Sequence, residues 1–329
     1  MSCLRLKDLP SSLPNKIGWP WSEENPRLFD SSLDKSLWPK ISIITPSYNQ
    51  GNFIEETIRS VLLQGYPNLE YIIIDGGSTD NSIDIIKKYE RFLAYWVTEP
   101  DRGQTHAVNK GIEISTGNII GWINSDDVYC KDTFKIILNN MLINRDIFYP
   151  IVFGGIELID EKSRLLRAFP GKPVNREKLI GFWRQDWHIP QPTVFFRSDI
   201  LKSNKPNESL HYAMDWELYL RISEKYPFRH IPKILAQFRA HGDSKTSGGW
   251  GPFTREQIVL SKKYWGERYI YYSLDYHLWP VTKRVKKLLG ILRRIFRGVL
   301  GQDRYEKAKC LKTQVFTFCA KGLEGIFNF

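Results

Sequence analysis

Short apolar runs alternate with segments of helical periodicity in the first half of the chain. The apolar runs predict buried strands over 41–45, 71–75, 95–98 and 119–123. Apolar residues recur every three or four positions between these runs, which predicts helices over 53–62, 83–89 and 105–115. Short strands that alternate with helices are typical of a parallel sheet covered on both faces. We therefore expect an α/β, doubly wound, mostly parallel sheet with helices on both faces.

The second half has a more mixed pattern but contains no internal repeat or long linker. Its pattern predicts a hairpin over 152–159 and 164–169, a strand over 193–197, a helix over 216–225 and a strand over 228–238. We expect this half to complete the same domain, which would span residues 40–275. Residues 1–39 are rich in Pro, Ser and Trp without periodicity, and they predict an irregular N-terminal arm.

Positive charge is concentrated near the C-terminus. Of the net charge of +11, residues 282–329 carry +9, from 12 Lys or Arg and 3 Asp or Glu, which leaves +2 for the rest. The apolar residues within 282–301 fall on one helical face, apart from the basic residues, so we expect residues 276–329 to form a basic amphipathic helical tail. Such a helix binds an anionic membrane surface, and the alternative is a helix packed on the main domain. Nucleic acid is disfavoured because no RNA-binding motif accompanies the charge.

Composition suggests where the protein resides. A chain of 329 residues, 42% of them hydrophobic, is long enough for one large core. The four cysteines show neither metal-site spacing nor the density of a disulfide framework, which favours a reducing compartment. The N-terminal residues resemble no signal peptide, and no run of about 18 apolar residues predicts a membrane span. We therefore expect a cytoplasmic protein, peripheral on the inner face of the cell membrane.

Polar residues follow each predicted strand of the first half. The four segments are Thr45-Pro-Ser-Tyr-Asn49, Asp75-Gly-Gly-Ser-Thr-Asp80, Glu99-Pro-Asp-Arg-Gly-Gln104 and Asn124-Ser-Asp-Asp127. Ligands of such sheets bind beyond the carboxyl ends of the strands, so these segments should converge on one binding rim. Asp126 and Asp127 repel each other, and a hard cation such as Mg²⁺ or Mn²⁺ would offset that repulsion and attract phosphate. Asp75 and the glycines after it suit a nucleotide.

These segments, together with Asn109-x-Gly111, resemble the family 2 glycosyltransferases of the GT-A fold over roughly residues 40–245. Each motif alone has low specificity for the family, but five motifs in the right order at matching strand ends are specific. The resemblance implies an inverting, metal-dependent hexosyltransferase. It would move one sugar from a nucleotide-diphosphate sugar, usually a UDP-sugar, to a hydroxyl of a saccharide or lipid-linked acceptor in cell-surface polysaccharide synthesis. The Gln-x-x-Arg-Trp motif of processive members is absent, which favours a non-processive enzyme.

The same resemblance assigns roles to the strand-end residues. Pro46, Tyr48 and Asp75 would hold the nucleotide base, and Asp101 would bind the nucleotide side of the donor. The remaining nucleotide-sugar contacts that it implies are Thr45, Asn49, Gly77, Gln104, Asn109, Asn124 and Ser125.

A cation site and a base complete the implied active site. Asp126 would bind a divalent cation, Mn²⁺ or Mg²⁺, with the donor diphosphate, and Asn124 stands where the family often has Asp. Asp215 falls at the position of the catalytic base, which takes the proton of the acceptor hydroxyl. His241 lies in a segment similar to the loop that closes over the diphosphate, and is a further candidate metal ligand. Other candidates for donor or acceptor contacts are Asp127, Gln191 and Trp216.

Each assignment has a plainer alternative. Asp126 would otherwise cap a helix near Thr133, and Asp215 would be an acid favoured at a helix start. Asp75 would be a loop cap without a ligand, and His241 an exposed histidine.

Two rival functions also remain. A nucleotidyltransferase shares the α/β layout and the paired carboxylates, but residues 45–49 lack its Gly-rich basic phosphate loop. A non-catalytic, nucleotide-binding, membrane-associated protein would keep the pocket without a base. A NAD-linked dehydrogenase is disfavoured because no G-x-G-x-x-G follows the first strand.

Overall fold

The computed structural model describes residues 4–11, 16–25, 38–143, 147–181, 189–242, 244, 251–266 and 277–278. The chain divides into two compact units, Met1–Gly266 and Glu267–Phe329. Every element named below belongs to the first unit. The tail expected over 276–329 lies almost entirely outside the described residues, and so it stays a prediction. No helix among the described residues is long and apolar enough to cross a bilayer.

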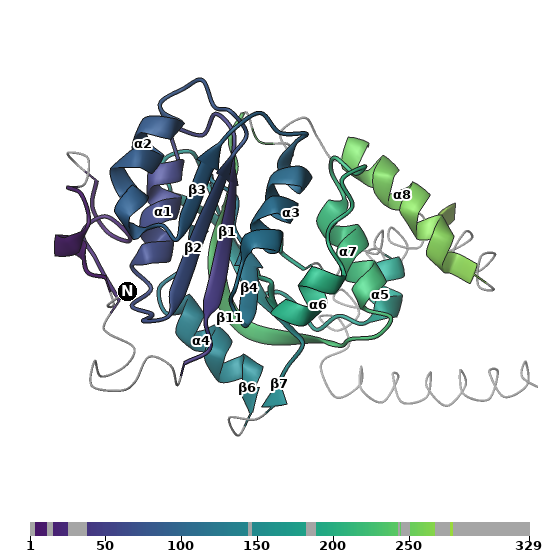
Figure 1. Ribbon diagram of the computed structural model, residues 1–329. Helices are drawn as coiled ribbons and strands as arrows, with labels where there is room; N and C mark the ends of the chain where they lie inside the picture. The colour runs from purple at the N-terminus through teal and green to yellow at the C-terminus, as the bar shows by residue number, and fades with distance from the viewer. Residues whose placement is uncertain are drawn as a thin grey trace, which may run out of the picture. The chain divides into compact units, whose positions relative to one another are not determined.

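Four parallel strands form the first half of the main sheet. In spatial order they are β3 (Tyr95–Thr98), β2 (Leu69–Asp75), β1 (Ile41–Ser47) and β4 (Ile119–Trp122). Helices connect them, namely α1 (Ile54–Leu62), α2 (Ser82–Tyr89) and α3 (Gln104–Ile114). Figure 1 shows α1 and α2 on one side of these strands and α3 on the other. The predicted doubly wound half is confirmed.

The second half extends the same sheet with mixed strand directions. Beyond β4 lie β10 (Phe195–Arg197), β8 (Ile151–Ile159), β11 (Phe228–Arg239) and β5 (Val128–Tyr129), and β9 (Leu165–Phe169) pairs with β8. Strand β10 is antiparallel to both β4 and β8, whereas β11 is parallel to β8. The predicted β8–β9 hairpin is confirmed as an antiparallel pair.

The remaining described elements lie outside the main sheet. They are α4 (Thr133–Met141), α5 (Arg176–Ile180), α6 (Ser198–Ser203), α7 (Met214–Ile222), α8 (Gly251–Trp265), the pair β6 (Leu142–Ile143) and β7 (Ile147–Phe148), and the 3₁₀ turns η1 (Leu6–Asp8), η3 (Glu90–Phe92) and η5 (Gln191–Thr193).

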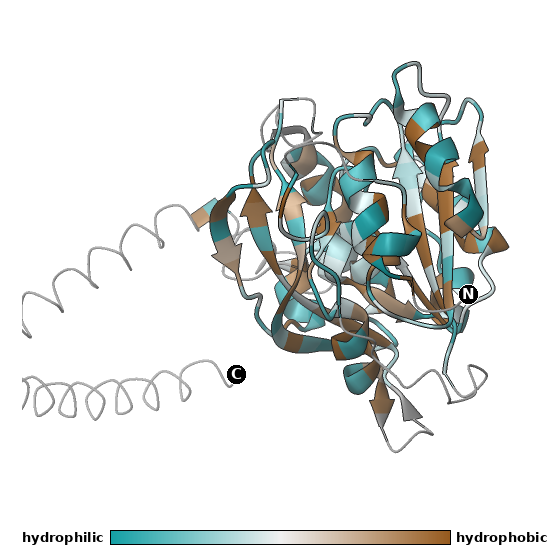
Figure 2. Ribbon diagram, turned by 90° about the vertical axis from the view of Figure 1, so that its left-hand side faces the viewer, coloured by the Kyte–Doolittle hydropathy of each residue, from teal (hydrophilic) through white to brown (hydrophobic). Residues whose placement is uncertain are grey.

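Strand β1 lies at the centre of the core and is buried at every position. Its side chains alternate between the two faces, so Ile43 joins the apolar cluster that includes Ile58 of α1. Ile44 faces α3, and a Cβ added at Gly111 would lie 2.3 Å from its Cγ2. The glycine in Asn109-x-Gly111 is therefore needed for the close approach of α3. Figure 2 shows the apolar colouring concentrated on the strands.

The described part of the N-terminal arm packs on α1 through a buried arginine. Arg59 is 1% exposed and donates to the carbonyls of Pro10, Pro20 and Trp21. The indole of Trp19 donates to the carbonyl of Tyr129 at 2.7 Å. These contacts attach the described part of the arm to α1 and to β5.

Candidate active site

The segments that follow β1 and β2 are joined by hydrogen bonds. The Asn49 backbone N–H donates to Ser78 Oγ at 2.8 Å, and Asn49 Oδ1 accepts from the Thr79 N–H at 2.8 Å. Asn49 has φ +52°, a left-handed conformation that asparagine tolerates. The Gly51 N–H donates to Asp80 Oδ2 at 2.8 Å. The two strand ends therefore converge as expected, and Asn49 fastens them together.

Asp75 is fully buried and points into the loop that follows β2. One carboxylate oxygen accepts from the N–H groups of Gly77 and Ser78 and from Thr98 Oγ1, at 3.1, 2.8 and 2.8 Å. The other accepts from Ser78 Oγ at 2.5 Å. The carboxylate therefore caps the loop that follows β2, and the expectation that Asp75 binds the nucleotide base stays a prediction.

The loops after β2 and β3 touch through glycine. A Cβ added at Gly76 would lie 2.8 Å from Asp101 Oδ2, and Gly77 has φ +86°, which disfavours any other residue. Asp101 Oδ1 accepts from the Gly103 N–H at 2.7 Å. Tyr48, at the end of β1, is 61% exposed. Asp101, Gly77 and Tyr48 therefore lie at the open end of the strands.

Three residues predicted to bind the donor lie within a strand or a helix. Strand β1 continues to Ser47, so Thr45 and Pro46 are buried within it, and Thr45 Oγ1 lies 3.1 Å from the Tyr71 hydroxyl. Asn109 lies in the middle of α3 and is buried. Its Nδ2 donates to Pro206 O and Glu208 Oε1, both at 3.0 Å. The side chains of Thr45 and Asn109 are therefore enclosed by the protein. The motif spacing could not show which way they face.

The two adjacent acids at the end of β4 have opposite environments. The Asp126 side chain is 17% exposed, and its Oδ2 lies 2.9 Å from His241 Nε2. Asp127 is fully buried, and its Oδ1 accepts from the Arg239 N–H at 3.0 Å. Burial, reinforced by the charge of Asp126, raises the pKa of Asp127 well above its ordinary value. Of the two acids, Asp126 keeps an exposed edge while Asp127 is enclosed by the protein, and the expectation that Asp127 contacts a ligand stays a prediction.

Neither plainer alternative for the proposed metal ligands fits. Helix α4 begins at Thr133 with Asp132 at its N-cap position, so Asp126 caps no helix there. His241 is buried, its side chain is 2% exposed, and the ring of Phe53 packs on it at a centroid distance of 4.6 Å. Its Nδ1 has no hydrogen-bond partner among the described residues.

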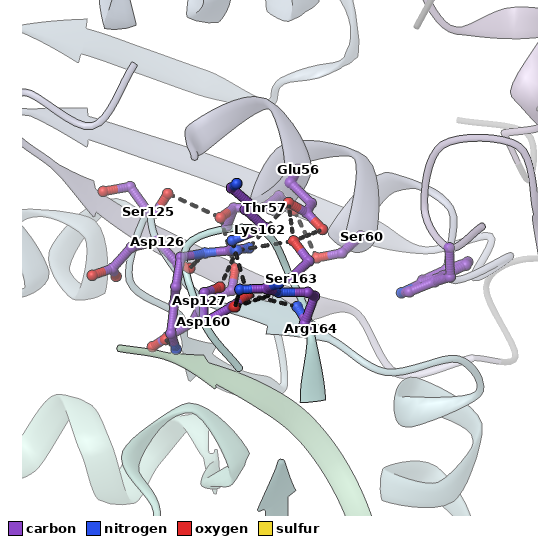
Figure 3. Close-up of polar contacts among 12 residues, drawn as sticks. Glu56, Thr57, Ser60, Ser125, Asp126, Asp127, Asp160, Lys162, Ser163 and Arg164 are labelled. Carbon is purple, nitrogen blue, oxygen red and sulfur yellow. Dashed lines mark hydrogen bonds and ion pairs between the residues drawn. The ribbon is translucent and has the colours of Figure 1, made fainter. Parts of the chain in front are cut away.

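The turn that carries Asp126 rests on α1. Thr57 Oγ1 lies 3.0 Å from the carbonyl oxygen of Ser125 and 2.7 Å from that of Asp127. Ser60 Oγ accepts from the Tyr129 N–H at 3.1 Å. Figure 3 shows Thr57 and Ser60 of α1 beside the turn. Ser125 is buried, so the turn is fixed at its backbone while the Asp126 side chain stays on the open side.

Consecutive residues at the start of α3 connect the Asp126 turn to the helix of Asp215. Gln104 Nε2 donates to Asn124 Oδ1 at 2.6 Å. Thr105 Oγ1 contacts Met214 Sδ at 2.7 Å, and Met214 is the first residue of α7. The turn that follows β4 and the start of α7 therefore both contact the start of α3.

The start of α7 is held by contacts that the sequence pattern did not reveal. Asp215 lies in the first turn, as its alternative interpretation also required, and its Oδ1 accepts from the Trp216 N–H at 2.7 Å. Glu256 of α8 accepts from the N–H groups of His211, Tyr212 and Ala213 at 3.2, 2.9 and 2.8 Å. A carboxylate from α8 therefore fixes the segment that leads into Asp215.

Gln191 and Trp216 lie close to this region but are largely enclosed. Gln191 Nε2 donates to the carbonyl of Trp122 at 2.8 Å, beside the end of β4. The Trp216 side chain is buried with 5% exposed. Gln191 therefore remains a candidate donor or acceptor contact, whereas Trp216 packs in the core of the protein.

The pair Asp126 and His241 suits a divalent cation. No group of three or more His, Cys, Asp or Glu side chains gathers among the described residues. Two neighbouring ligands of an octahedral ion with bonds of about 2.1 Å lie about 3 Å apart. Asp126 Oδ2 and His241 Nε2 are joined by a hydrogen bond of 2.9 Å, and this separation would also suit two neighbouring ligands of such an ion. A carboxylate and an imidazole are ligands for Mn²⁺, and the remaining positions would fall to phosphate and water.

Comparison with known proteins identifies the family. The sequence model of glycosyl transferase family 2 matches residues 42–205. An uncharacterised glycosyltransferase of Rickettsia prowazekii is 32% identical over 251 residues, which cover 68% of this chain and 76% of the relative. The chain belongs to glycosyltransferase family 2. For seven other relatives, the matched segment covers between 21% and 66% of their length. Family membership favours sugar transfer over the rival nucleotidyltransferase.

Solved structures agree with a GT-A fold for this family 2 glycosyltransferase. Residues 1–349 of Staphylococcus aureus TarS, in complex with UDP-GlcNAc, give a TM-score of 0.52 at 19% identity, over 67% of this chain and 66% of that one. The mannosyltransferase PcManGT of Pyrobaculum calidifontis, in complex with GDP-Man and Mn²⁺, gives 0.51 at 16% identity, over 86% and 81%. At these identities the likeness shows the fold alone, and the predicted fold class is confirmed.

Proposed function

We propose that this family 2 glycosyltransferase moves a single sugar from a nucleotide-diphosphate sugar, preferably a UDP-sugar, to a hydroxyl of a saccharide or lipid-linked acceptor. One observation carries the proposal. Gln104 and Thr105, adjacent on α3, contact the turn of Asp126 and the start of the Asp215 helix. These contacts support a shared region for Asp126, the proposed cation ligand, and Asp215, the proposed general base. The UDP-GlcNAc and GDP-Man complexes of the two similar structures support a nucleotide-sugar donor.

The donor nucleotide would lie across the ends of β1 to β3. Tyr48 is exposed there and offers an aromatic face to a base. Gly76 and Gly77 allow the ligand to approach the backbone, beside Asp101. Asp75 would act from below, because its four hydrogen bonds fix the loop on which the ligand rests.

The diphosphate end of the donor would lie at the end of β4. Asp126 and His241 would hold a divalent cation there, and such a cation, when bound, stabilises the charge of the departing nucleoside diphosphate. Asn124, fixed by Gln104, would orient toward the donor from the same turn. Asp127 would stay out of the reaction, since it is buried and bonded to the backbone of Arg239.

Asp215 would be the general base. Its carboxylate, oriented by the Trp216 N–H, would take the proton of the acceptor hydroxyl. The hydroxyl oxygen would then form the new bond to the anomeric carbon as the bond to the diphosphate breaks on the opposite face. Displacement from the opposite face inverts the configuration at that carbon.

The Asp215→Asn variant tests the base, because the amide keeps the shape but cannot accept the proton. We expect transfer to fall by about 10² to 10⁴ while UDP still raises the melting temperature as in the wild type. Glu217→Gln, two residues along the same helix, is the matched control, since Glu217 pairs with Arg221 at 3.0 Å. Full transfer by Asp215→Asn with normal UDP binding would remove Asp215 from the mechanism.

We also propose that the enzyme works on the cytoplasmic face of a membrane. The support is the basic, apolar sequence of residues 282–301, which lies outside the described residues. The full chain should sediment with vesicles that contain anionic lipid, and a chain truncated after Asp275 should not. Equal sedimentation of both proteins would contradict this location.

A further inference from the structure

A fully buried arginine contacts the turn of one proposed metal ligand and lies two residues before the other in the chain. Arg239, at the end of β11, has no exposed surface. Its Nε donates to the carbonyl oxygen of Asp126 at 2.8 Å, and its backbone N–H donates to Asp127 Oδ1 at 3.0 Å. His241 follows it by two residues along the chain. Arg239 therefore holds the turn that carries Asp126, and its strand leads directly into His241.

The guanidinium of Arg239 also joins two other elements. Its Nη2 donates to Glu56 Oε2 of α1 at 3.0 Å. Its Nη1 donates to the carbonyl oxygen of Asp160 at 3.1 Å and to Ser163 Oγ at 2.9 Å, both in the β8–β9 hairpin. Figure 3 shows Glu56, Asp160 and Ser163 around the turn of Asp126. A planar group with several fixed donors can make all these contacts at once, which a lysine cannot.

The burial of the ion pair of Arg239 and Glu56 costs desolvation free energy. Its presence in the core therefore points to a role in geometry. Both side chains are at most 6% exposed, and burial of two charges is weak evidence for stability alone. Ser163 completes the network with its hydroxyl 2.9 and 3.0 Å from the two Glu56 oxygens. It does so from a left-handed conformation with φ +60°, a strained state that surrounding contacts must maintain.

An aromatic ring links the same arginine to the second ligand. The Arg239 guanidinium carbon lies 5.0 Å from the centre of the Phe53 ring. Phe53 packs in turn on the imidazole of His241. The arginine therefore fixes the backbone behind Asp126 by hydrogen bonds and supports the ring of His241 through Phe53.

We propose that Arg239, held by Glu56, is a positioning residue that sets the distance between Asp126 Oδ2 and His241 Nε2. It thereby tunes the affinity of the enzyme for its divalent cation. The inference rests on the proposed metal role of Asp126 and His241. Arg239 itself touches neither substrate nor cation, because its donors are used by the protein.

Arg59 provides a matched control. It is an arginine of nearly equal burial, 1% exposed, and it also makes four hydrogen bonds. Its acceptors, however, lie in the N-terminal arm and on Tyr89. Replacement of either arginine by lysine should destabilise the fold, but only one should alter the cation site.

The test uses the full chain in three variants, Arg239→Lys, Arg59→Lys and Asp126→Asn. Mn²⁺ binding is measured by the electron paramagnetic resonance signal of free Mn²⁺, with and without UDP. Transfer is then measured against Mn²⁺ concentration at saturating donor. We expect Arg239→Lys to weaken Mn²⁺ binding about 10- to 100-fold, with most of kcat restored at high Mn²⁺. Arg59→Lys should lower the melting temperature and leave Mn²⁺ binding unchanged.

The outcomes separate the inference from the function on which it rests. If Asp126→Asn binds Mn²⁺ as the wild type does, the metal site itself is wrong. If Asp126→Asn loses Mn²⁺ while folded Arg239→Lys keeps wild-type affinity, only the positioning role is overturned. Should Arg239→Lys fail to fold, Glu56→Gln and Ser163→Ala loosen the same network, and unchanged Mn²⁺ affinity in both would overturn the role equally.

Discussion

The anchor of the N-terminal arm and the metal rim each depend on a buried arginine, but the acceptors differ. Arg59 donates to three backbone carbonyls and to the hydroxyl of Tyr89, all neutral groups. Arg239 donates to the carboxylate of Glu56 and to the turn and hairpin that frame Asp126. The first arrangement fastens a segment to the body. The second fixes the relative positions of groups that would bind a ligand.

The same contrast holds between the two adjacent acids of the rim. The carboxyl group of Asp127 serves the fold, since it is buried and accepts from the backbone N–H of Arg239. Asp126 is left on the open side, where His241 Nε2 is its partner. Most buried polar groups thus form a framework that holds the site. A smaller set of polar side chains remains available to bind ligands. The predictions below separate the two sets, beginning with the largest effect.

Loss of a proposed metal ligand should have the largest effect. Asp126→Ala and His241→Ala should each reduce transfer about 100-fold or more at low Mn²⁺, because several kcal/mol of charge stabilisation is lost. The measurement is the initial rate as a function of Mn²⁺ concentration. Asp132→Ala removes a nearby acid that makes no side-chain cap to α4, and it should keep the wild-type rate. A wild-type Mn²⁺ profile in both ligand variants would contradict the account.

Loss of the arm anchor should affect stability and leave the chemistry alone. Arg59→Met leaves the carbonyls of Pro10, Pro20 and Trp21 without their donor, and we expect the free energy of unfolding to fall by about 3 kcal/mol. Urea denaturation measures this fall. The kcat of the folded variant and its Mn²⁺ dependence should match the wild type. A selective loss of Mn²⁺ affinity would erase the distinction between the two arginines.

Glu70 offers a smaller, pH-dependent effect at the other end of the sheet. Burial alone would raise the pKa of Glu70, but hydrogen bonds from Ser42 and Thr116, with the charge of Lys40, lower it overall. A depressed folded-state pKa contributes stability above the unfolded value of 4.5 and loses it as pH falls through the folded value. Glu70→Gln should therefore cost about 1–3 kcal/mol at pH 7 and progressively less below pH 4.5. A difference that stays constant down to pH 3 would contradict this.

Cys130 should show the smallest effect, a chemical one without functional consequence. Burial, with the nearby charge of Glu157, raises the pKa of the Cys130 thiol from 9.0 to about 12. In a chain with Cys3, Cys310 and Cys319 changed to serine, the thiolate fraction at pH 8 should be about a thousandfold lower than in the unfolded chain. Reaction with a disulfide reagent measures it. Equal rates with and without urea would show that Cys130 is accessible.

The sequence was sufficient for the elements and for the location of the rim. Apolar runs and their helical intervals placed β1 to β4 and α1 to α3, because the first half obeys a regular alternation. The reversal of direction at β10 could not be predicted, since a three-residue strand carries no directional signal.

The sequence could not say which motif residues face the ligand. Thr45, Asp75, Asn109 and Asp127 belong to the motifs, yet their side chains are buried in the framework. Their orientation depends on strand length and on partners distant in sequence. Arg239 and Glu256 were missed for the same reason, because their hydrogen-bond partners lie 113 and 44 residues away in sequence.

The central claim is that Asp126 and His241 hold a divalent cation for the donor diphosphate. Anomalous diffraction at the manganese edge, from crystals grown with Mn²⁺ and UDP, tests it most directly. The account predicts one peak within bonding distance of Asp126 Oδ2 and His241 Nε2, in contact with the UDP phosphates. UDP bound across the strand ends, with the Mn²⁺ peak elsewhere or at neither side chain, would contradict it.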